Sequence, residues 1–355
     1  MISNNDVIEE IEGLIRVYKD GKVERPEIVP CVAASLADPD DDEQLEEGVT
    51  SRDVFIDKST NVWARFYVPK TITTSQAAQK LKIPLLVYFH GGGFCVGSAA
   101  WSCYHEFLSK LSAKLSCLIM SVNYRLAPEN PLPAAYEDGF KALTWLKRQA
   151  IMKNDNVSKY YCPWSKHCDF SRIFLVGDSA GGNIAYNLAT RLTSNSGLDA
   201  KRLEPLTFKG TVLVQPFFGG EPRTDSEKCS PRRSALSLAA SDTYWRLALP
   251  AGANRDHPWC NPLAKGSVLI EPESNNNLST NKLTRVWPIM VCVSEMDILR
   301  DRNLEFCGAL EKKTKVEYMV YGGVGHAFQI LSKSQLSQIR THEMMAHIKD
   351  FITRY

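Results

Sequence analysis

Residues 173–183, IFLVGDSAGGN, decide the fold. An apolar run at 173–176 leads directly into a Gly-x-Ser-x-Gly turn, and apolar residues at helical spacing follow from Ile184 onward. A strand that turns sharply into a helix holds the serine in a strained backbone conformation, and the flanking glycines let strand and helix pack closely. The stretch therefore predicts a reactive, exposed Ser179 at the start of a helix; a serine that only caps the helix is the alternative.

Further apolar runs on either side of this stretch indicate a sheet. They are bounded by Pro, Gly or Asn, and helical patterns such as the one carrying Tyr136, Phe140 and Leu143 fall between several of them. Continuous apolar strands alternating with helices are typical of a mostly parallel sheet that is buried on both faces. The predicted fold class is therefore α/β, with an antiparallel pair at the sheet edge. The expected parallel strands are 84–89, 117–122, 173–176, 211–215, 288–293 and 317–321, and the edge pair is 53–56 and 61–68 around a turn at 58–60.

The balanced charge of the chain argues against nucleic acid and anionic membranes as partners. The chain has 355 residues, of which 44% are hydrophobic, enough for a large core in a single domain over 1–355. Lys and Arg (42) nearly balance Asp and Glu (40), so no net charge recruits nucleic acid or an anionic membrane. No apolar run approaches the roughly 18 residues that span a bilayer. We read the acidic stretch 38–47 as a solvated loop and the oligomeric state as open.

The cysteines and the N-terminus bear on location and metals. Ten cysteines in a chain of this length, behind an acidic start, fit reduced thiols in the cytoplasm, with the nucleus as an additional location. Cys162, His167 and Cys168 lie close together but lack a second paired module at zinc-finger spacing, so we expect no metal and no cofactor.

A glycine run follows the expected strand 84–89. His90-Gly91-Gly92-Gly93-Phe94 lets the backbone approach a ligand, and a phosphate loop would need a lysine and a Ser or Thr that are missing here. An oxyanion hole fits better, because preset N–H donors stabilise the negative charge of a tetrahedral intermediate. The expected donors are Gly92, Gly93 and Ala180.

A serine nucleophile needs a base and an acid that orients it. Of seven histidines, only His326 lies in a glycine-rich loop directly after a late strand, and it follows Ser179 in the chain, as hydrolases of this architecture require. The acid should follow the preceding strand, where Asp297 stands 29 residues before the histidine. Glu295 and Asp301 remain competitors for that role.

The joint motifs resemble a known family. HGGGF, the run 124–129 (YRLAPE), GDSAGGN, DILRD and GHAF are similar to those of the hormone-sensitive-lipase branch of α/β-hydrolases, and within it to the plant carboxylesterase class, carboxylesterase 17-like members above all. The resemblance covers nearly the whole chain. It implies a triad of Ser179, Asp297 and His326. It also implies a small helical cap, contributed by about 1–30 and parts of 219–277.

The implied cap suggests where substrate binds. Its apolar and aromatic residues suit a neutral cavity, with no Lys or Arg beside the oxyanion motif to hold an anionic acyl group. Arginines in the insertion, such as Arg223 and Arg246, are expected to be solvated or paired with acids such as Asp242, and not turned toward substrate. The predicted substrate-binding residues are Leu14, Ile15, Phe94, Phe217, Phe218, Tyr244 and Trp245.

The sequence thus predicts a serine carboxylesterase that hydrolyses small to medium neutral esters through an acyl-enzyme on Ser179. Relatives of this class also act as cyclases, dehydratases or lactone-forming transesterases, and intact triad residues leave that alternative open. Gibberellin receptors resemble the chain as well but have lost the catalytic histidine. Because His326 is present, a small-molecule receptor is the less favoured alternative.

Overall fold

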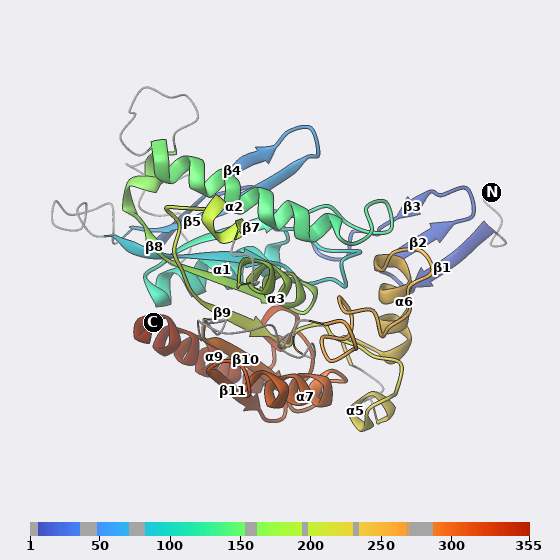
Figure 1. Ribbon diagram of the computed structural model, residues 1–355. Helices are drawn as coiled ribbons and strands as arrows, with labels where there is room; N and C mark the ends of the chain where they lie inside the picture. Colours follow the sequence, from blue (N-terminus) through green and yellow to red (C-terminus); the bar gives the residue numbers. More distant parts are fainter. Residues whose placement is uncertain are drawn as a thin grey trace, which may run out of the picture.

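An eight-stranded sheet forms the centre of the molecule (Figure 1). The computed structural model describes residues 6–35, 48–70, 82–152, 162–193, 198–229, 234–267, 269 and 287–355. The strand order is β11-β10-β9-β8-β6-β7-β5-β4. The bounds are β4 (Val49–Asp57), β5 (Val62–Pro69), β6 (Ile83–Phe89), β7 (Leu118–Asn123), β8 (Cys168–Asp178), β9 (Phe208–Val214), β10 (Ile289–Ser294) and β11 (Val316–Tyr321).

The pairing confirms the predicted α/β class. The six strands from β11 to β7 are parallel to their neighbours, whereas β5 pairs with β7 and with β4 in antiparallel fashion at one edge. All eight strands expected from the sequence are present, and the edge pair turns where expected, between Asp57 and Val62. The carboxyl ends of the parallel strands meet at one edge of the sheet, which is where open α/β sheets place their ligands.

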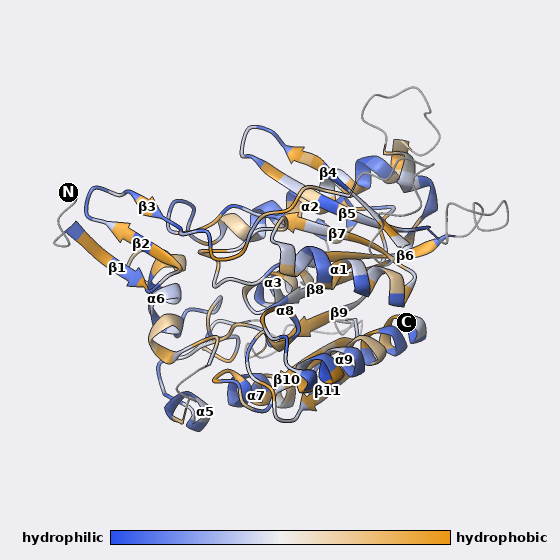
Figure 2. Cartoon of the chain, turned by 180° about the vertical axis from the view of Figure 1, so that it is seen from behind, coloured by the Kyte–Doolittle hydropathy of each residue, from blue (hydrophilic) through white to orange (hydrophobic). Residues whose placement is uncertain are grey.

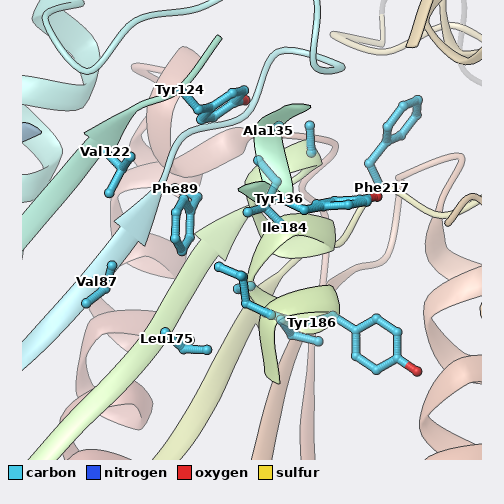
Figure 3. Close-up of a cluster of buried hydrophobic side chains, with 14 of the residues drawn as sticks. Val87, Phe89, Val122, Tyr124, Ala135, Tyr136, Leu175, Ile184, Tyr186 and Phe217 are labelled. Atoms are coloured by element: carbon cyan, nitrogen blue, oxygen red, sulfur yellow. The ribbon is translucent and has the colours of Figure 1, made fainter. Parts of the chain in front are cut away.

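Helices cover both faces because successive side chains of a strand point to opposite sides. From β6, Leu85, Val87 and Phe89 join a core with helices α2, α3 and α7, whereas Leu86 and Tyr88 join a second core with α1 and α9. Figure 3 shows part of the first core, where strand residues gather with Ile184 of α3. Strands β9 and β10 are hydrophobic in Figure 2. The bounds are α1 (Ser102–Leu115), α2 (Ala134–Met152), α3 (Ala180–Thr193), α4 (Leu198–Arg202), α7 (Arg300–Leu310), α8 (Phe328–Leu331) and α9 (Gln335–Arg354), with a 3₁₀ turn at Pro163–His167.

The N-terminal segment differs from the helical cap that we expected. It forms a second, three-stranded antiparallel sheet of β1 (Val7–Ile11), β2 (Ile15–Tyr18) and β3 (Val23–Glu24). Glycines with positive φ, Gly13 at 72° and Gly21 at 86°, make the two turns, a conformation that glycine adopts without strain. Two hairpins thus form the segment that we expected to contribute to a helical cap.

This small sheet lies beside the insertion after β9 (Figure 1). The described part of the insertion contains the expected helix, as α5 (Asp225–Lys228) and α6 (Leu238–Ala248), and β1 packs against α6. The acidic stretch 38–47 and residues 270–277 of the insertion lie outside the described residues. Within the described part of the chain, no helix is both long and apolar enough to cross a membrane.

Candidate active site

Ser179 occupies a sharp turn between β8 and α3. Its φ of 51° lies in the left-handed region, the strain expected at such a turn. The flanking glycines are required sterically, because a Cβ at Gly177 would come 2.2 Å from the Gly181 carbonyl oxygen, and one at Gly181 would come 1.9 Å from that of Phe89. Ser179 is only 6% exposed. The prediction of an exposed serine was therefore wrong, because other parts of the chain cover the turn.

His326 and Asp297 meet Ser179 at this turn. The Nε2 atom of His326 lies 2.9 Å from Ser179 Oγ, and its Nδ1 lies 2.7 Å from Asp297 Oδ2. Because a carboxylate can only accept, Nδ1 carries the hydrogen and Nε2 is left to accept one from the serine hydroxyl. The Oδ1 atom of Asp297 accepts a hydrogen bond from the Leu299 backbone N–H at 3.1 Å, which fixes the carboxylate.

The two competing acids are bound elsewhere. Glu295 Oε2 accepts from the Gly323 backbone N–H at 2.7 Å, and Asp301 Oδ2 accepts from the Ser226 backbone N–H at 2.7 Å. Of the three carboxylates, the structure brings Asp297 to the imidazole.

A residue that the sequence analysis missed holds the histidine loop. Gln215 directly follows β9, has a φ of 47°, and accepts the backbone N–H of Ala327 on its Oε1 at 2.6 Å. Its amide nitrogen donates to Ser294 Oγ, also at 2.6 Å. Gln215 therefore ties the loop that carries His326 to the ends of two strands. No sequence pattern reveals this, since the bonded residues stand 112 positions apart.

Charges around the imidazole favour its protonated form. Burial alone lowers the pKa of His326, but the negative charge of Asp297, its hydrogen bond, and the charge of Asp178 outweigh burial and leave the pKa above its ordinary 6.5. Asp178 directly precedes Ser179 in the chain, and burial raises the pKa of its carboxyl to about 6.

The glycine run of 90–94 lies beside the serine. Gly92 and Gly93 have φ of 109° and 58°, and a Cβ at Gly92 would come 2.1 Å from the Val96 carbonyl oxygen, so only glycine fits there. Among the described residues, no protein acceptor takes the backbone N–H of Gly92, Gly93 or Ala180. Three donors are thus free for a ligand, as an oxyanion hole requires.

His90 at the start of this loop is a structural residue. Burial lowers the pKa of His90 to about 4, so the ring is neutral, and its Nδ1 donates to the Gly91 carbonyl at 2.7 Å. The ring stacks on Tyr124 at a centroid distance of 4.3 Å, and the Tyr124 hydroxyl donates to the His90 carbonyl at 2.8 Å.

Arg25 is a second residue that the sequence analysis missed. Its guanidinium donates to the carbonyls of Cys95 at 2.6 Å and Ala127 at 2.9 Å, and pairs with Glu129. It thereby joins the segment after β3, the end of the glycine loop and the YRLAPE run. The YRLAPE run therefore helps to hold the glycine loop in place.

Four of the predicted substrate-binding residues form one aromatic cluster next to the glycine loop. Phe217 stacks on Trp245 at 4.6 Å, Phe94 contacts both, and Tyr244 meets Phe217 edge-on. The ring of Tyr244 also lies directly over Gly93. This cluster joins α6 to the glycine loop.

The other three predicted residues lie apart from that cluster in different ways. Phe218 packs against Tyr186 and Phe306, at centroid distances of 5.7 and 4.7 Å, in the core between α3 and α7. That position argues against substrate contact. Ile15 is fully buried in β2 and Leu14 is half-buried beside it, so both act in packing the N-terminal sheet.

Arg223 and Arg246, two described arginines of the insertion, are paired with acids, one of the two outcomes that we expected. Arg223 pairs with Asp242 at 2.6 Å, and Arg246 of α6 pairs with Glu9 of β1 at 2.8 Å. The second pair links the insertion to the N-terminal sheet. Arg232 and Arg233 lie outside the described residues.

Comparison with known proteins agrees with this geometry. Residues 86–330 match the family model of the alpha/beta hydrolase fold. The chain is 52% identical to probable carboxylesterase 6 of Arabidopsis thaliana, over 98% of this chain and 92% of that protein. It therefore belongs to the plant carboxylesterase family of α/β-hydrolases. The carboxylesterase 17-like subgroup stays a prediction.

More distant relatives carry other names. A 2-hydroxyisoflavanone dehydratase of Glycyrrhiza echinata is 35% identical over 92% of each chain. The gibberellin receptor GID1A of Arabidopsis thaliana is 33% identical over 86% of this chain and 81% of the receptor. Among solved structures, an esterase of Pyrobaculum calidifontis has a TM-score of 0.64 at 24% identity, covering 84% of each chain, which shows the shared fold.

Proposed function

We propose that this protein is a serine carboxylesterase that hydrolyses small to medium neutral esters through an acyl-enzyme on Ser179. The observation that carries the proposal is the continuous chain from Ser179 Oγ to His326 Nε2 at 2.9 Å and from His326 Nδ1 to Asp297 Oδ2 at 2.7 Å. A buried hydroxyl, base and acid in this order are the parts that acyl transfer needs. The 52% identity with a protein named probable carboxylesterase 6 supports it.

The first half of the reaction forms the acyl-enzyme. Ser179 Oγ attacks the ester carbonyl carbon while its proton passes to His326 Nε2, and Asp297 stabilises the resulting imidazolium. The carbonyl oxygen becomes negative and accepts the free N–H groups of Gly92, Gly93 and Ala180. When the carbon–oxygen bond to the alcohol breaks, the imidazolium returns its proton to the leaving oxygen.

The second half releases the acid. A water molecule, deprotonated by the neutral His326, attacks the acyl carbon, and the same three donors hold the second tetrahedral intermediate. The bond to Ser179 Oγ then breaks, and the serine takes the proton back from Nε2. Ester and water are thereby converted into acid and alcohol, and the enzyme is regenerated.

The N-terminal sheet and α6 serve as the cap over this site. Support comes from Tyr244 of α6 against Gly93 and from the Arg246–Glu9 pair between α6 and β1. The side chains of Phe94, Phe217 and Tyr244 beside the glycine loop are aromatic, which favours neutral acyl or alcohol groups. The partner is accordingly a small-molecule ester.

A covalent label tests the proposed function. A fluorophosphonate should modify the wild type once, and Ser179→Ala should abolish both labelling and hydrolysis of p-nitrophenyl butyrate. Ser109→Ala, which changes a buried serine on α1, is the matched control and should keep both. An unlabelled wild type with an intact fold would count against an activated Ser179.

The alternatives give different results in the same assays. A dehydratase, as the relative at 35% identity is named, removes water without an acyl-enzyme, so mass spectrometry would find no acyl group on Ser179 during turnover. A receptor would bind its ligand equally well after His326→Val. An esterase should lose at least about 10²-fold in rate when that base is removed.

The cytoplasmic location, with the nucleus as an additional one, is part of the proposal. All ten cysteines lie in the described part of the chain, and all ten are free thiols, as in a reducing compartment. Fluorescence microscopy of a tagged chain tests this location.

A further inference from the structure

Asp178, the residue before the proposed nucleophile, is a buried carboxylate that the proposed reaction does not use. It is 1% exposed, and two tyrosines donate to it, Tyr88 to Oδ1 at 2.7 Å and Tyr104 to Oδ2 at 2.9 Å. Burying a carboxylate costs free energy unless hydrogen bonds compensate. Packing alone therefore does not explain why a carboxylate stands at this position of the turn.

The hydroxyl of Tyr104 gives that reason, because it bonds in two directions. While donating to Asp178, it accepts the backbone N–H of Gly91 at 2.8 Å. Gly91 opens the glycine run and immediately precedes the proposed donors Gly92 and Gly93. The hydrogen bonds thus run without a break from the residue before Ser179 to the peptide before the oxyanion donors.

The fit around Gly91 is close. A Cβ on Gly91 would come 2.7 Å from Asp178 Oδ2, 3.0 Å from the Tyr104 hydroxyl and 3.1 Å from Ser179 Cβ. Other side chains hold the glycine loop as well. Tyr124 ties it to the YRLAPE run, and Arg25, through the Cys95 carbonyl, ties its end to the N-terminal segment. Tyr104 ties it to the turn that carries the serine.

We infer that Tyr104, oriented by Asp178, is a positioning residue that sets the distance between the oxyanion donors and Ser179. The inference rests on the proposed function and deepens it. Oxyanion donors act only when they lie about 2.7–3.1 Å from the developing charge, and small displacements are costly in rate. Loss of this tie should therefore affect the transition state more than substrate binding.

A matched pair of variants tests this. Tyr104→Phe and Tyr88→Phe each remove one buried hydroxyl from the same carboxylate, but only the first removes the acceptor of the Gly91 N–H. Tyr104→Phe should lower kcat for p-nitrophenyl butyrate by about 10-fold or more, with KM within about 3-fold of wild type. It should weaken inhibition by a trifluoromethyl ketone by a similar factor. Tyr88→Phe should keep kcat within about 3-fold.

Hydrogen–deuterium exchange gives a second readout that needs no turnover. Peptides covering 90–96 should exchange faster in Tyr104→Phe than in wild type and remain unchanged in Tyr88→Phe. If the wild type hydrolyses esters and the two variants behave alike in rate and exchange, this inference is wrong and the proposed function stands. If the wild type hydrolyses no ester, the proposed function fails, and exchange alone decides whether Tyr104 positions the loop.

Asp178→Asn covers the case in which Tyr104→Phe does not fold. The two tyrosines donate to different oxygens of Asp178, and one of these becomes an amide NH2 group that can only donate, so the Tyr104 hydroxyl is held less firmly. We expect a smaller loss of kcat, about 3- to 10-fold, with faster exchange at 90–96. Wild-type kcat and exchange in this variant would overturn the inference.

Discussion

The ring of Tyr244 lies against the α-carbon of Gly93, so close that a Cβ built on Gly93 would come 2.3 Å from Tyr244 Cγ. Gly93→Ala must therefore move either the ring or the glycine loop, and its φ of 58° also strains an alanine. Because Gly93 is a proposed oxyanion donor, we expect kcat for p-nitrophenyl butyrate to fall about 10²-fold or more.

Gly252→Ala separates strain from contact. Gly252 has a φ of 81°, but a Cβ there would meet nothing within 4 Å. Gly252→Ala should lose stability through the same kind of backbone strain as Gly93→Ala, but it should keep wild-type kcat. Equal losses of kcat in Gly93→Ala and Gly252→Ala would show that the effect is general strain and not the oxyanion loop.

The pair of Asp297 and His326 predicts a pH dependence. The rate constant kcat/KM should rise as His326 loses its proton, with a midpoint above 6.5, because the charge of Asp297 holds the pKa of His326 up against burial. Asp297→Asn should move that midpoint to lower pH and reduce kcat by up to about 10⁴-fold. The raised pKa also stabilises the fold at pH below about 6.5, and this contribution is lost as pH rises through the folded-state pKa.

Two neighbouring acids supply the controls for that experiment. Glu295→Gln and Asp301→Asn remove carboxylates whose hydrogen bonds go to Gly323 and Ser226, so the pH midpoint and kcat should stay near wild type. Were Glu295→Gln far more damaging than Asp297→Asn, the assignment of the acid would have to be reversed.

A buried ion pair predicts where the insertion is anchored. Glu227 of α5 and Arg302 of α7 are 4% and 9% exposed and lie 3.0 Å apart. Removing one charge leaves the other buried and unpaired, so Glu227→Gln should lower the free energy of unfolding in urea by about 3–5 kcal/mol. Asp225→Asn, on the same helix in an exposed pair with Lys228, should change it by less than about 0.5 kcal/mol. Equal effects of the two substitutions would contradict this role of the buried pair.

The sequence predicted what local patterns encode. Continuous apolar runs marked the six parallel strands, and a turn at 58–60 marked the edge pair. The turn at 177–181, together with the order of Ser179, Asp297 and His326, predicted the candidate site. The sequence favoured Asp297 and left Glu295 and Asp301 as competitors, because all three acids stand within seven residues. The directions of the three side chains, which spacing does not encode, bring Asp297 to His326 in the structure.

What the sequence could not predict depends on contacts between distant residues. Gln215 and Tyr104 act through partners 112 and 13 or more positions away, so no spacing marks them. The N-terminal hairpins were missed although Gly13 and Gly21 could have indicated two turns. Phe217 and Phe218 are adjacent and chemically alike, yet they point into different clusters, a distinction that only the backbone direction determines.

The aromatic cluster predicts the preferred acyl group. Each buried acyl methylene adds up to about 0.8 kcal/mol, or about fourfold in kcat/KM, until the cavity ends. For p-nitrophenyl esters we expect kcat/KM to climb with chain length and then fall, with the maximum at short to medium chains. Tyr244→Ala should move the maximum to longer chains, whereas Tyr318→Ala, an exposed tyrosine on β11, should leave it unchanged.

Charge gives the sharper version of this test. A hemisuccinyl ester has the four-carbon acyl chain of a butyryl ester with a carboxylate at its end. Arg223 and Arg246 are already paired, with Asp242 and Glu9. If the acyl group binds at the predicted residues Phe217 and Tyr244, that carboxylate therefore lacks a partner. We expect kcat/KM to be at least about 10-fold higher for p-nitrophenyl butyrate than for the hemisuccinate. The reverse preference would mean that one of these arginines leaves its acid to bind substrate, and Arg223→Gln and Arg246→Gln would then identify which one.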